Sequence, residues 1–279
     1  MSADEQALFL QRLAEDLNSK NITLPSFPDV VVKIRTALED PTCSSERLAA
    51  VVRTDAVLVA RLLMAANSAF HNRAGIDIVD LDLAISRLGF EVVRNTAIAL
   101  AVEQIFAASK HENIKSAIEE IWHTSLSLAS MSFVVARHSG KLNPDNAFLC
   151  GLLHQIGKLY ILTHAQEYPA LMGNPESLKS ILEQWYASIG KSIVDAWGFP
   201  DEIAASLDLE DGMQSNADAP PTLVDVVFTA QRLLDDALTL DTDAALQDCA
   251  GKLMVNSDSY PTIEEAYQLH AQSTRSSVS

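Results

Sequence analysis

One apolar stretch, residues 147–160, constrains the fold of this chain more than any other part of its sequence. Its large apolar residues recur at the three- and four-residue spacing of a helix that is buried over a broad face. These residues are Phe148, Leu149, Leu152, Leu153, Ile156, Leu159 and Tyr160. Asn143 and Pro144 stand just before them, and asparagine caps free helical amides while proline needs no N–H in the first turn. We therefore predict a single helix that begins at Pro144 and runs through the middle of a helical core.

Two pairs of residues interrupt the apolar pattern of this predicted helix. Gly151 and Gly157 are unfavourable inside a helix, unless neighbouring backbones approach so closely that no side chain fits. His154 and Lys158 are four residues apart, so both project from one face of the helix. A polar pair on so apolar a helix is either a functional site or a satisfied network in the core.

The rest of the chain reads as further helices. Apolar residues recur with a helical period between proline, glycine and capping residues, and no run alternates as a half-buried strand would. The expected helices lie within residues 9–17, 29–40, 45–52, 55–68, 80–88, 114–140, from 175 onward, 223–234 and 243–255. Residues 272–279 are expected to be disordered. The predicted fold class is all-α.

The charge of the chain limits its partners. The net charge is −17, and residues 195–279 hold 16 acidic and 3 basic residues, which is −13 of that total. An acidic surface repels phosphate groups, so we expect neither nucleic acid nor an anionic membrane as a partner.

The cysteines and the apolar runs indicate a cytoplasmic protein. Cys43, Cys150 and Cys249 are far apart in the sequence, which argues against a disulfide framework and against a zinc site. The first residues are acidic where a signal peptide is basic, and the most apolar run, residues 96–108, is too short to span a membrane. We therefore expect no export and no membrane segment.

Several short motifs resemble a known protein family. Gly-Leu-Leu-His-Gln-Ile-Gly-Lys, at residues 151–158, is similar to the Gly-Leu-Leu-His-Asp-Ile-Gly-Lys signature of the HD superfamily of metal-dependent phosphohydrolases, with Gln155 in place of the aspartate. Residues 24–28, 64–70 and 84–89 resemble the N-terminal half of the HD-related output domain, or HDOD domain. With these motifs in order, residues 20–215 are similar to an HDOD domain, a degenerate branch of that superfamily.

This resemblance implies a multi-helical HDOD/HD-like fold with two packed helical subdomains. The N-terminal subdomain would span residues 20–112 and the degenerate HD-like subdomain residues 113–215. A helix within residues 1–19 would precede them. A helical extension with a disordered tail, residues 216–279, would follow.

The resemblance also locates the positions that hold a metal in active HD enzymes. Those positions carry His123, His154, Gln155 and Gln231 in this sequence, and Tyr186 stands where a further histidine is expected. Two imidazoles without carboxylates do not make the site that polarises phosphate and activates water. Asp225 is a further carboxylate to consider, although no motif supports it as a ligand. We therefore expect no catalytic residue, no bound metal and no cofactor, and we favour His123 as a histidine at the edge of the core.

The resemblance implies a bacterial, non-catalytic signal-transduction output or scaffold domain that acts by contact with other proteins of a signalling pathway. One alternative is a metal-dependent phosphohydrolase acting on a nucleotide or cyclic dinucleotide. A second is a sensor that binds a small ligand in the vestigial pocket, where the candidate residues are His123, His154, Lys158 and Tyr186. The sequence does not name the signal, the partner or the oligomeric state.

Two places are candidates for the contact surface. Asn67 and Ser68 either cap the end of a helix, which we favour, or belong to an interface between the two halves of the domain. Glu210 and Asp211 lie in an acidic stretch that is either a solvated connector, which we favour, or a landing site for a basic partner.

Overall fold

The computed structural model of the chain describes residues 2–19, 29–72, 75–107, 112–209, 219–236 and 244–278. These residues form helices joined by turns, and none of them forms a β-strand, so the predicted all-α class is confirmed. No helix among them is both long and apolar enough to cross a membrane. The chain divides into two compact units, one of residues 1–24 with 109–256 and one of residues 25–108 with 257–279.

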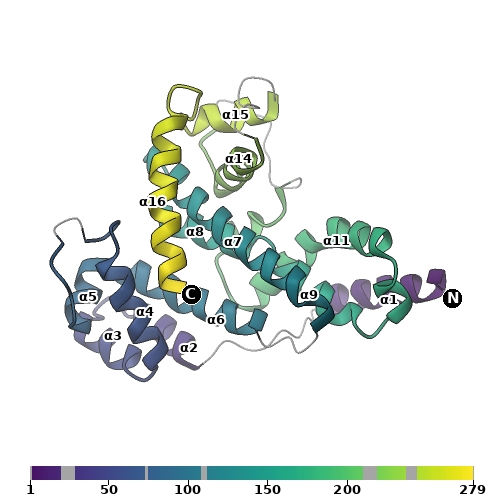
Figure 1. Cartoon of the computed structure of the whole chain (residues 1–279), viewed down its shortest axis with the longest axis horizontal. Coiled ribbons are helices and arrows are strands. Elements are labelled where there is room, and N and C mark those ends of the chain that lie inside the picture. Colours follow the sequence, from purple (N-terminus) through teal and green to yellow (C-terminus); the bar gives the residue numbers. More distant parts are fainter. Residues whose placement is uncertain are drawn as a thin grey trace. The chain divides into compact units, whose positions relative to one another are not determined.

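The unit of residues 25–108 and 257–279 packs short amphipathic helices around the apolar helix α6 (Figure 1). Its helices are α2 Asp29–Leu38, α3 Ser45–Val52, α4 Ala56–Asn67, α5 Leu81–Leu88, α6 Phe90–Ala107 and α16 Tyr260–Val278. Ser44, Asp55 and Asp80 cap α3, α4 and α5 by accepting hydrogen bonds from free amides of the first turn. Gly89 ends α5 at a φ of 83°, a left-handed conformation that glycine adopts without strain.

The other unit is built around a long helical hairpin. Its helices are α1 Ser2–Ser19, α7 Glu112–Ser139, α8 Pro144–Leu153, α9 Ile156–Ala165, α10 Pro169–Met172, α11 Pro175–Ala196, α12 Asp201–Ala205, α14 Leu223–Asp236 and α15 Ala244–Lys252. The helices α7 and α8 make the most extensive packing in the structure, and a short turn joins them, so they run antiparallel (Figure 1). The expected cap at Asn143 is present, since its side chain accepts from the amide of Asp145 at 2.8 Å.

The single helix predicted from Pro144 to Tyr160 is in fact two helices. Gln155 takes a φ of −103° and a ψ of 11°, which ends α8 and starts α9 one residue later. The two halves pack on different partners, α8 on α7 and α9 on α11. A straight helix could not follow both partners, so the chain turns at His154 and Gln155, in the middle of its signature motif.

The two glycines of this segment lie where helices approach most closely, as predicted. A Cβ atom on Gly151 would stand 2.6 Å from the backbone nitrogen of Ala129 in α7. A Cβ atom on Gly157 would stand 2.0 Å from the carbonyl oxygen of Tyr186 in α11 and 2.8 Å from the nitrogen of Gly190. Because these neighbours are backbone atoms, a side chain at either position requires the helices to move apart.

Both ends of the chain differ from the expected division into segments. The helix α1 belongs with residues 109–256 because Arg12 pairs with Glu167 at 2.5 Å and Asp16 accepts from the hydroxyl of Tyr160 at 2.7 Å. The expected extension 216–279 is divided, since α14 and α15 lie in that unit while α16 packs on α4 and α6 in the other. The tail predicted to be disordered, residues 272–279, continues as α16 to Val278, and Ser273 and Thr274 are buried there.

Replacing Gly157 should destabilise the fold. Gly157→Ala puts a methyl group into the backbone of α11 and should lower the free energy of unfolding by about 1–3 kcal/mol, and Gly157→Leu should lower it further. The matched control is Gly251→Ala in α15, where a Cβ atom meets nothing within 4 Å and the helix should gain up to about 1 kcal/mol. Urea unfolding of the three variants measures the difference, and an unchanged midpoint for Gly157→Ala would contradict the close packing of α9 on α11.

Candidate functional site

His154 occupies the most unusual position in the signature motif. It is the residue that follows α8, and only 1% of its side chain is exposed. Neither ring nitrogen makes a hydrogen bond of full geometry with a described residue, and only the backbone of Ser206 among these residues acts on the ring as a hydrogen-bonding group. A buried polar group without a partner destabilises a fold, so an imidazole in this state is an exception that requires an explanation.

Tyr186 and Lys158 enclose His154 from neighbouring helices. The Tyr186 ring, on α11, meets the His154 ring edge to face with 5.7 Å between centroids. The ammonium of Lys158, on α9, lies 5.0 Å from the centroid of the same Tyr186 ring. A cation over an aromatic face and an aromatic edge contact are both favourable, so the three side chains form one packed cluster. The structure thus brings together three of the four residues predicted to line a vestigial pocket.

Burial sets the protonation of this cluster. Burial and the charge of Lys158 together lower the pKa of His154 to about 4, although the backbone of Ser206 acts in the opposite direction. Burial also lowers the pKa of Lys158, although the charges of Glu183 and Glu120 act against that shift. His154 is therefore neutral at pH 7, with one nitrogen that can donate and one that can accept.

Buried hydroxyls of α7 and α14 also lack hydrogen-bond partners among the described residues. Gly151 contacts α7 at Leu128 and Ala129, and α7 and α8 are antiparallel, so the residue one turn beyond Gly151 faces the region of Ser125. Ser125 is fully buried and its hydroxyl has no hydrogen-bond partner among the described residues. Thr229, on the adjacent α14, is in the same condition. Neither hydroxyl belongs to a sequence motif, so the sequence gives no signal for them.

The other positions of the vestigial ligand set do not join this cluster. His123 is exposed on α7, so the expected histidine at the core edge is in fact on the surface. Gln155 is buried beside His154, and Gln231 is half-buried on α14. Neither amide bonds to the His154 ring, because both ring nitrogens lack partners. Within the described part of the chain, no three histidine, cysteine, aspartate or glutamate side chains are grouped so as to hold a metal ion.

Asp225, the further carboxylate considered as a ligand, has a different set of partners. It is 3% exposed, accepts from the hydroxyl of Thr222 at 2.8 Å and pairs with the buried ammonium of Lys252 at 3.1 Å. Lys252 pairs with Asp248 as well, at 3.3 Å. Burial alone would lower the pKa of Lys252, but the hydrogen bonds and charges of Asp225 and Asp248 outweigh it and raise the pKa. These groups connect α14 to α15.

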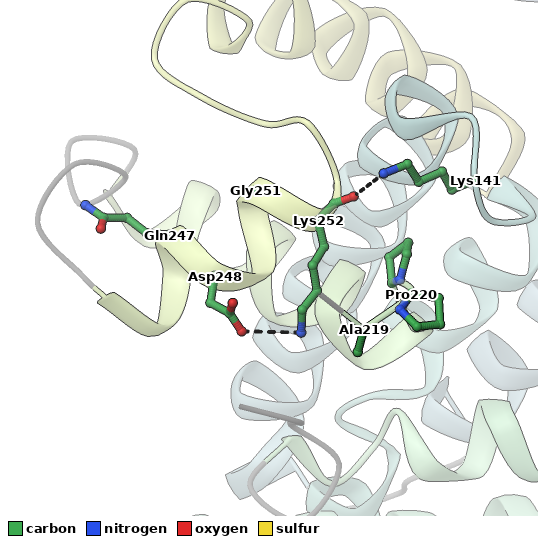
Figure 2. Close-up of a pocket in the computed structure, with 8 residues that line it drawn as sticks. Lys141, Ala219, Pro220, Gln247, Asp248, Gly251 and Lys252 are labelled. Atoms are coloured by element: carbon green, nitrogen blue, oxygen red, sulfur yellow. Dashed lines mark hydrogen bonds and ion pairs between the residues drawn. The ribbon is translucent and has the colours of Figure 1, made fainter. Parts of the chain in front are cut away.

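A surface pocket of about 390 Å³ opens beside this ion pair (Figure 2). Its walls are formed by Lys141, Ala219, Pro220, Pro221, Gln247, Asp248, Gly251 and Lys252. Lys141 donates to the carbonyl of Lys252 at 2.8 Å, which caps the C-terminal end of α15 with a positive charge. The sequence held no signal for this pocket, since its residues come from three separate segments.

Of the two predicted contact surfaces, the structure describes the one at Asn67 and Ser68 but not the one at Glu210 and Asp211. The Asn67 amide holds both backbone groups of Ile78, at 2.7 and 2.8 Å, so it ties a following segment to the end of α4. The Ser68 hydroxyl donates to Ala65 and accepts from Ser273 of α16, within the same unit. Glu210 and Asp211 lie outside the described residues, and their role as a contact site stays a prediction.

Comparison with known proteins identifies the fold and the family. A family model described as HDOD domain matches residues 24–211. A protein of Treponema pallidum (strain Nichols) without an assigned function is 22% identical over 207 residues, and the match spans 69% of this chain but only 38% of that protein.

Among solved structures, a protein from Shewanella amazonensis SB2B with the provisional name metal-dependent phosphohydrolase superposes with a TM-score of 0.79 and 23% identity, over 97% of this chain and 99% of that one. An HDOD domain protein of unknown function from Geobacter sulfurreducens superposes with a TM-score of 0.65 and 21% identity, over 90% of this chain and 93% of that one. A protein from Marinobacter aquaeolei VT8 with the provisional name signal transduction protein superposes with a TM-score of 0.63 and 19% identity, over 99% of this chain and 67% of that one. At these identities the likeness shows the fold.

The buried imidazole should make the stability of the fold depend on pH. Between pH 6.5 and about 4 the unfolded chain binds a proton that folded His154 excludes, so the free energy of unfolding falls as the pH is lowered through this range. In His154→Gln this contribution is absent, and the decline should be shallower by up to about 1.4 kcal/mol per pH unit. Urea unfolding at pH 7, 6 and 5 measures the slopes. His123→Gln, an exposed control, should keep the slope of the parent, and an equal slope for His154→Gln would contradict the burial of a neutral ring.

Removing the charge of Lys252 should destabilise the unit that contains α14 and α15. Lys252→Met leaves the Asp225 carboxylate buried without its cation, and we expect a loss of about 3–5 kcal/mol. The control is Lys179→Met, which removes an exposed pair with Glu183 and should change stability by no more than about 0.5 kcal/mol. Equal effects of the two substitutions in thermal and urea unfolding would show that the Lys252 pair is not buried.

Proposed function

Because this chain belongs to the HDOD family, which is related to the HD phosphohydrolases, we propose that it is a non-catalytic output or scaffold domain of bacterial signal transduction. It acts by contact with another protein of the pathway. The provisional name of the Marinobacter aquaeolei VT8 protein, a signal transduction protein, agrees with this class of function. No partner is named by these comparisons.

The environment of His154 is the observation that carries this proposal. In the signature motif the imidazole is buried, neutral and packed against Tyr186 and Lys158. A hydrolytic metal site needs carboxylate or further imidazole ligands and an open position for water. Gln155 stands where the family signature has a carboxylate, and Asp225 is paired with Lys252. These residues fit a closed core better than a phosphohydrolase centre.

The phosphohydrolase alternative rests on the provisional name of the Shewanella amazonensis SB2B structure. It requires donors from outside the cluster to complete a site around His154. Such a site would have to be assembled without the aspartate of the signature motif, and the amide of Gln155 is a weak ligand for a divalent ion.

A second candidate function has one specific observation in its favour. Both nitrogens of His154 and the hydroxyls of Ser125 and Thr229 are buried and without partners among the described residues. A small polar ligand bound among these groups could form hydrogen bonds with them. Binding of the ligand to the folded chain would then raise the free energy of unfolding. This sensor function uses the same region of the core as the vestigial metal site.

The direct test compares metal content and hydrolysis. Purified protein is incubated with Mn²⁺, Fe²⁺ or Zn²⁺, desalted, analysed for metal and assayed with a chromogenic phosphodiester and with a cyclic dinucleotide. We expect less than one bound metal per chain and no turnover above that of His154→Ala, because the carboxylate ligands are absent from the cluster. One metal per chain with turnover, both lost in His154→Ala, would establish the phosphohydrolase alternative instead.

A further inference from the structure

Exposed apolar side chains gather in one short part of the chain. Five of the nine large apolar side chains that the described residues leave exposed lie within residues 57–83, with exposed fractions from 49 to 87%. We call these five the α4–α5 surface, and they are Val57, Met64, Ile76, Val79 and Leu83. Single exposed apolar residues are ordinary, but a group of them bordered by polar residues is typical of an interaction site.

Polar contacts and helix packing join the elements that carry these five residues. At the C-terminal end of α4, the Asn67 side chain binds the backbone of Ile78. At the other end, Arg53 just before α4 pairs with Asp82 of α5. The segment between Ile78 and Asp82 therefore runs along the side of α4. Val57 and Met64 are seven residues apart, so they share one exposed face of α4.

The segment that carries Ile76 and Val79 is held in place by side chains that bind its backbone. Asn72 donates to the carbonyl of Ile76 at 3.0 Å, and Arg87 in turn donates to Asn72 at 2.8 Å. The exposed side chains take no part in this support, which comes from backbone and polar contacts. When a partner docks here, the segment loses little conformational entropy, since its conformation is already set before binding.

The charge beside the α4–α5 surface indicates the kind of partner. Residues 75–83 hold Asp77, Asp80 and Asp82 and no lysine or arginine, and among the described residues Asp82 pairs with Arg53. Asp77 and Asp80 are exposed on either side of Val79. A second copy of this chain would bring the same carboxylates and a net charge of −17, so like charges oppose self-association.

We propose that the α4–α5 surface docks an amphipathic segment of a partner protein, with apolar side chains on one face and lysine or arginine on the other. The apolar residues fill the surface between Val57, Val79 and Leu83, and the basic residues pair with Asp77 and Asp80. This inference rests on the proposed function, because it assigns the place of the protein contact and the chemistry of the partner.

The experiment uses the full chain and a defined probe. The probe is a fluorescent 18-residue helical peptide with leucine on one face and lysine on the other, and a scrambled peptide of equal composition is its control. Binding is followed by fluorescence anisotropy for the parent chain, Val79→Ser/Leu83→Ser, Asp77→Lys, and Leu8→Ser, an exposed apolar control on α1 in the other unit. These side chains are at least half exposed or lie on the surface, so the variants should fold, and their melting temperatures verify this.

We expect Val79→Ser/Leu83→Ser to bind the amphipathic peptide at least about tenfold more weakly than the parent, and Leu8→Ser to bind it as the parent does. Asp77→Lys should weaken binding and reduce its dependence on salt. Hydrogen exchange should slow within residues 56–83 on binding. Equal binding by all variants, or equal binding of the scrambled peptide, would overturn the proposal.

The proposal would also be overturned if the α4–α5 surface were covered by a second copy of the chain or by another part of the same chain. A concentration-dependent dimer in sedimentation, strengthened by salt and lost in Val79→Ser/Leu83→Ser, would assign the surface to a second copy. Protection of the Met64 thioether from oxidation by peroxide in the free chain, with no peptide binding, would mean that the chain covers the surface itself. Either result leaves the proposed function standing, whereas metal-dependent turnover by the parent chain would remove that function independently of peptide binding.

Discussion

The structure of the signature motif depends on two contacts in which helix backbones touch without side chains between them. Gly151 sets α8 against α7, and Gly157 sets α9 against α11 at a carbonyl of Tyr186. Since each contact leaves no room for a methyl group, the two helices cannot slide or separate independently. The chain must turn between them, and the turn falls at His154 and Gln155. The position of the imidazole is thus a consequence of helix packing before any chemistry is considered.

That position determines what His154 can do. The contact of Gly157 with α11 brings Tyr186 over the imidazole, and Lys158, one residue on, reaches the outer face of the same ring. Burial keeps the imidazole neutral, and the carboxylate that the related enzymes have next to it is an amide here. Asp225 is engaged by Lys252. The same packing that would align a metal ligand in an active relative encloses an unpaired histidine in this chain.

The sequence predicted more of the fold than of the site, and the reasons are physical. Helical periodicity, the cap at Asn143 and the glycines at close contacts are local signals, so the sequence predicts them. The break after His154 was missed because an apolar pattern of constant period does not show where a helix changes partner. His123 was expected at the edge of the core and is exposed, because a difference of one or two positions rotates a helical side chain to the opposite face. The Asp225 pair with Lys252 joins residues far apart in the sequence and leaves no local pattern.

The central claim is that His154 is an enclosed, neutral imidazole rather than a metal ligand. Long-range ¹H–¹⁵N correlation spectra of the histidine rings, with His154→Gln for assignment, measure this directly by the shifts of its two ring nitrogens. We predict one protonated and one unprotonated nitrogen from pH 7 down to pH 5, unchanged by excess Zn²⁺ or Mg²⁺, because burial lowers the pKa to about 4 and no carboxylate shares the site. An imidazolium at pH 6, or a ring-nitrogen shift on addition of one equivalent of metal, would contradict the account.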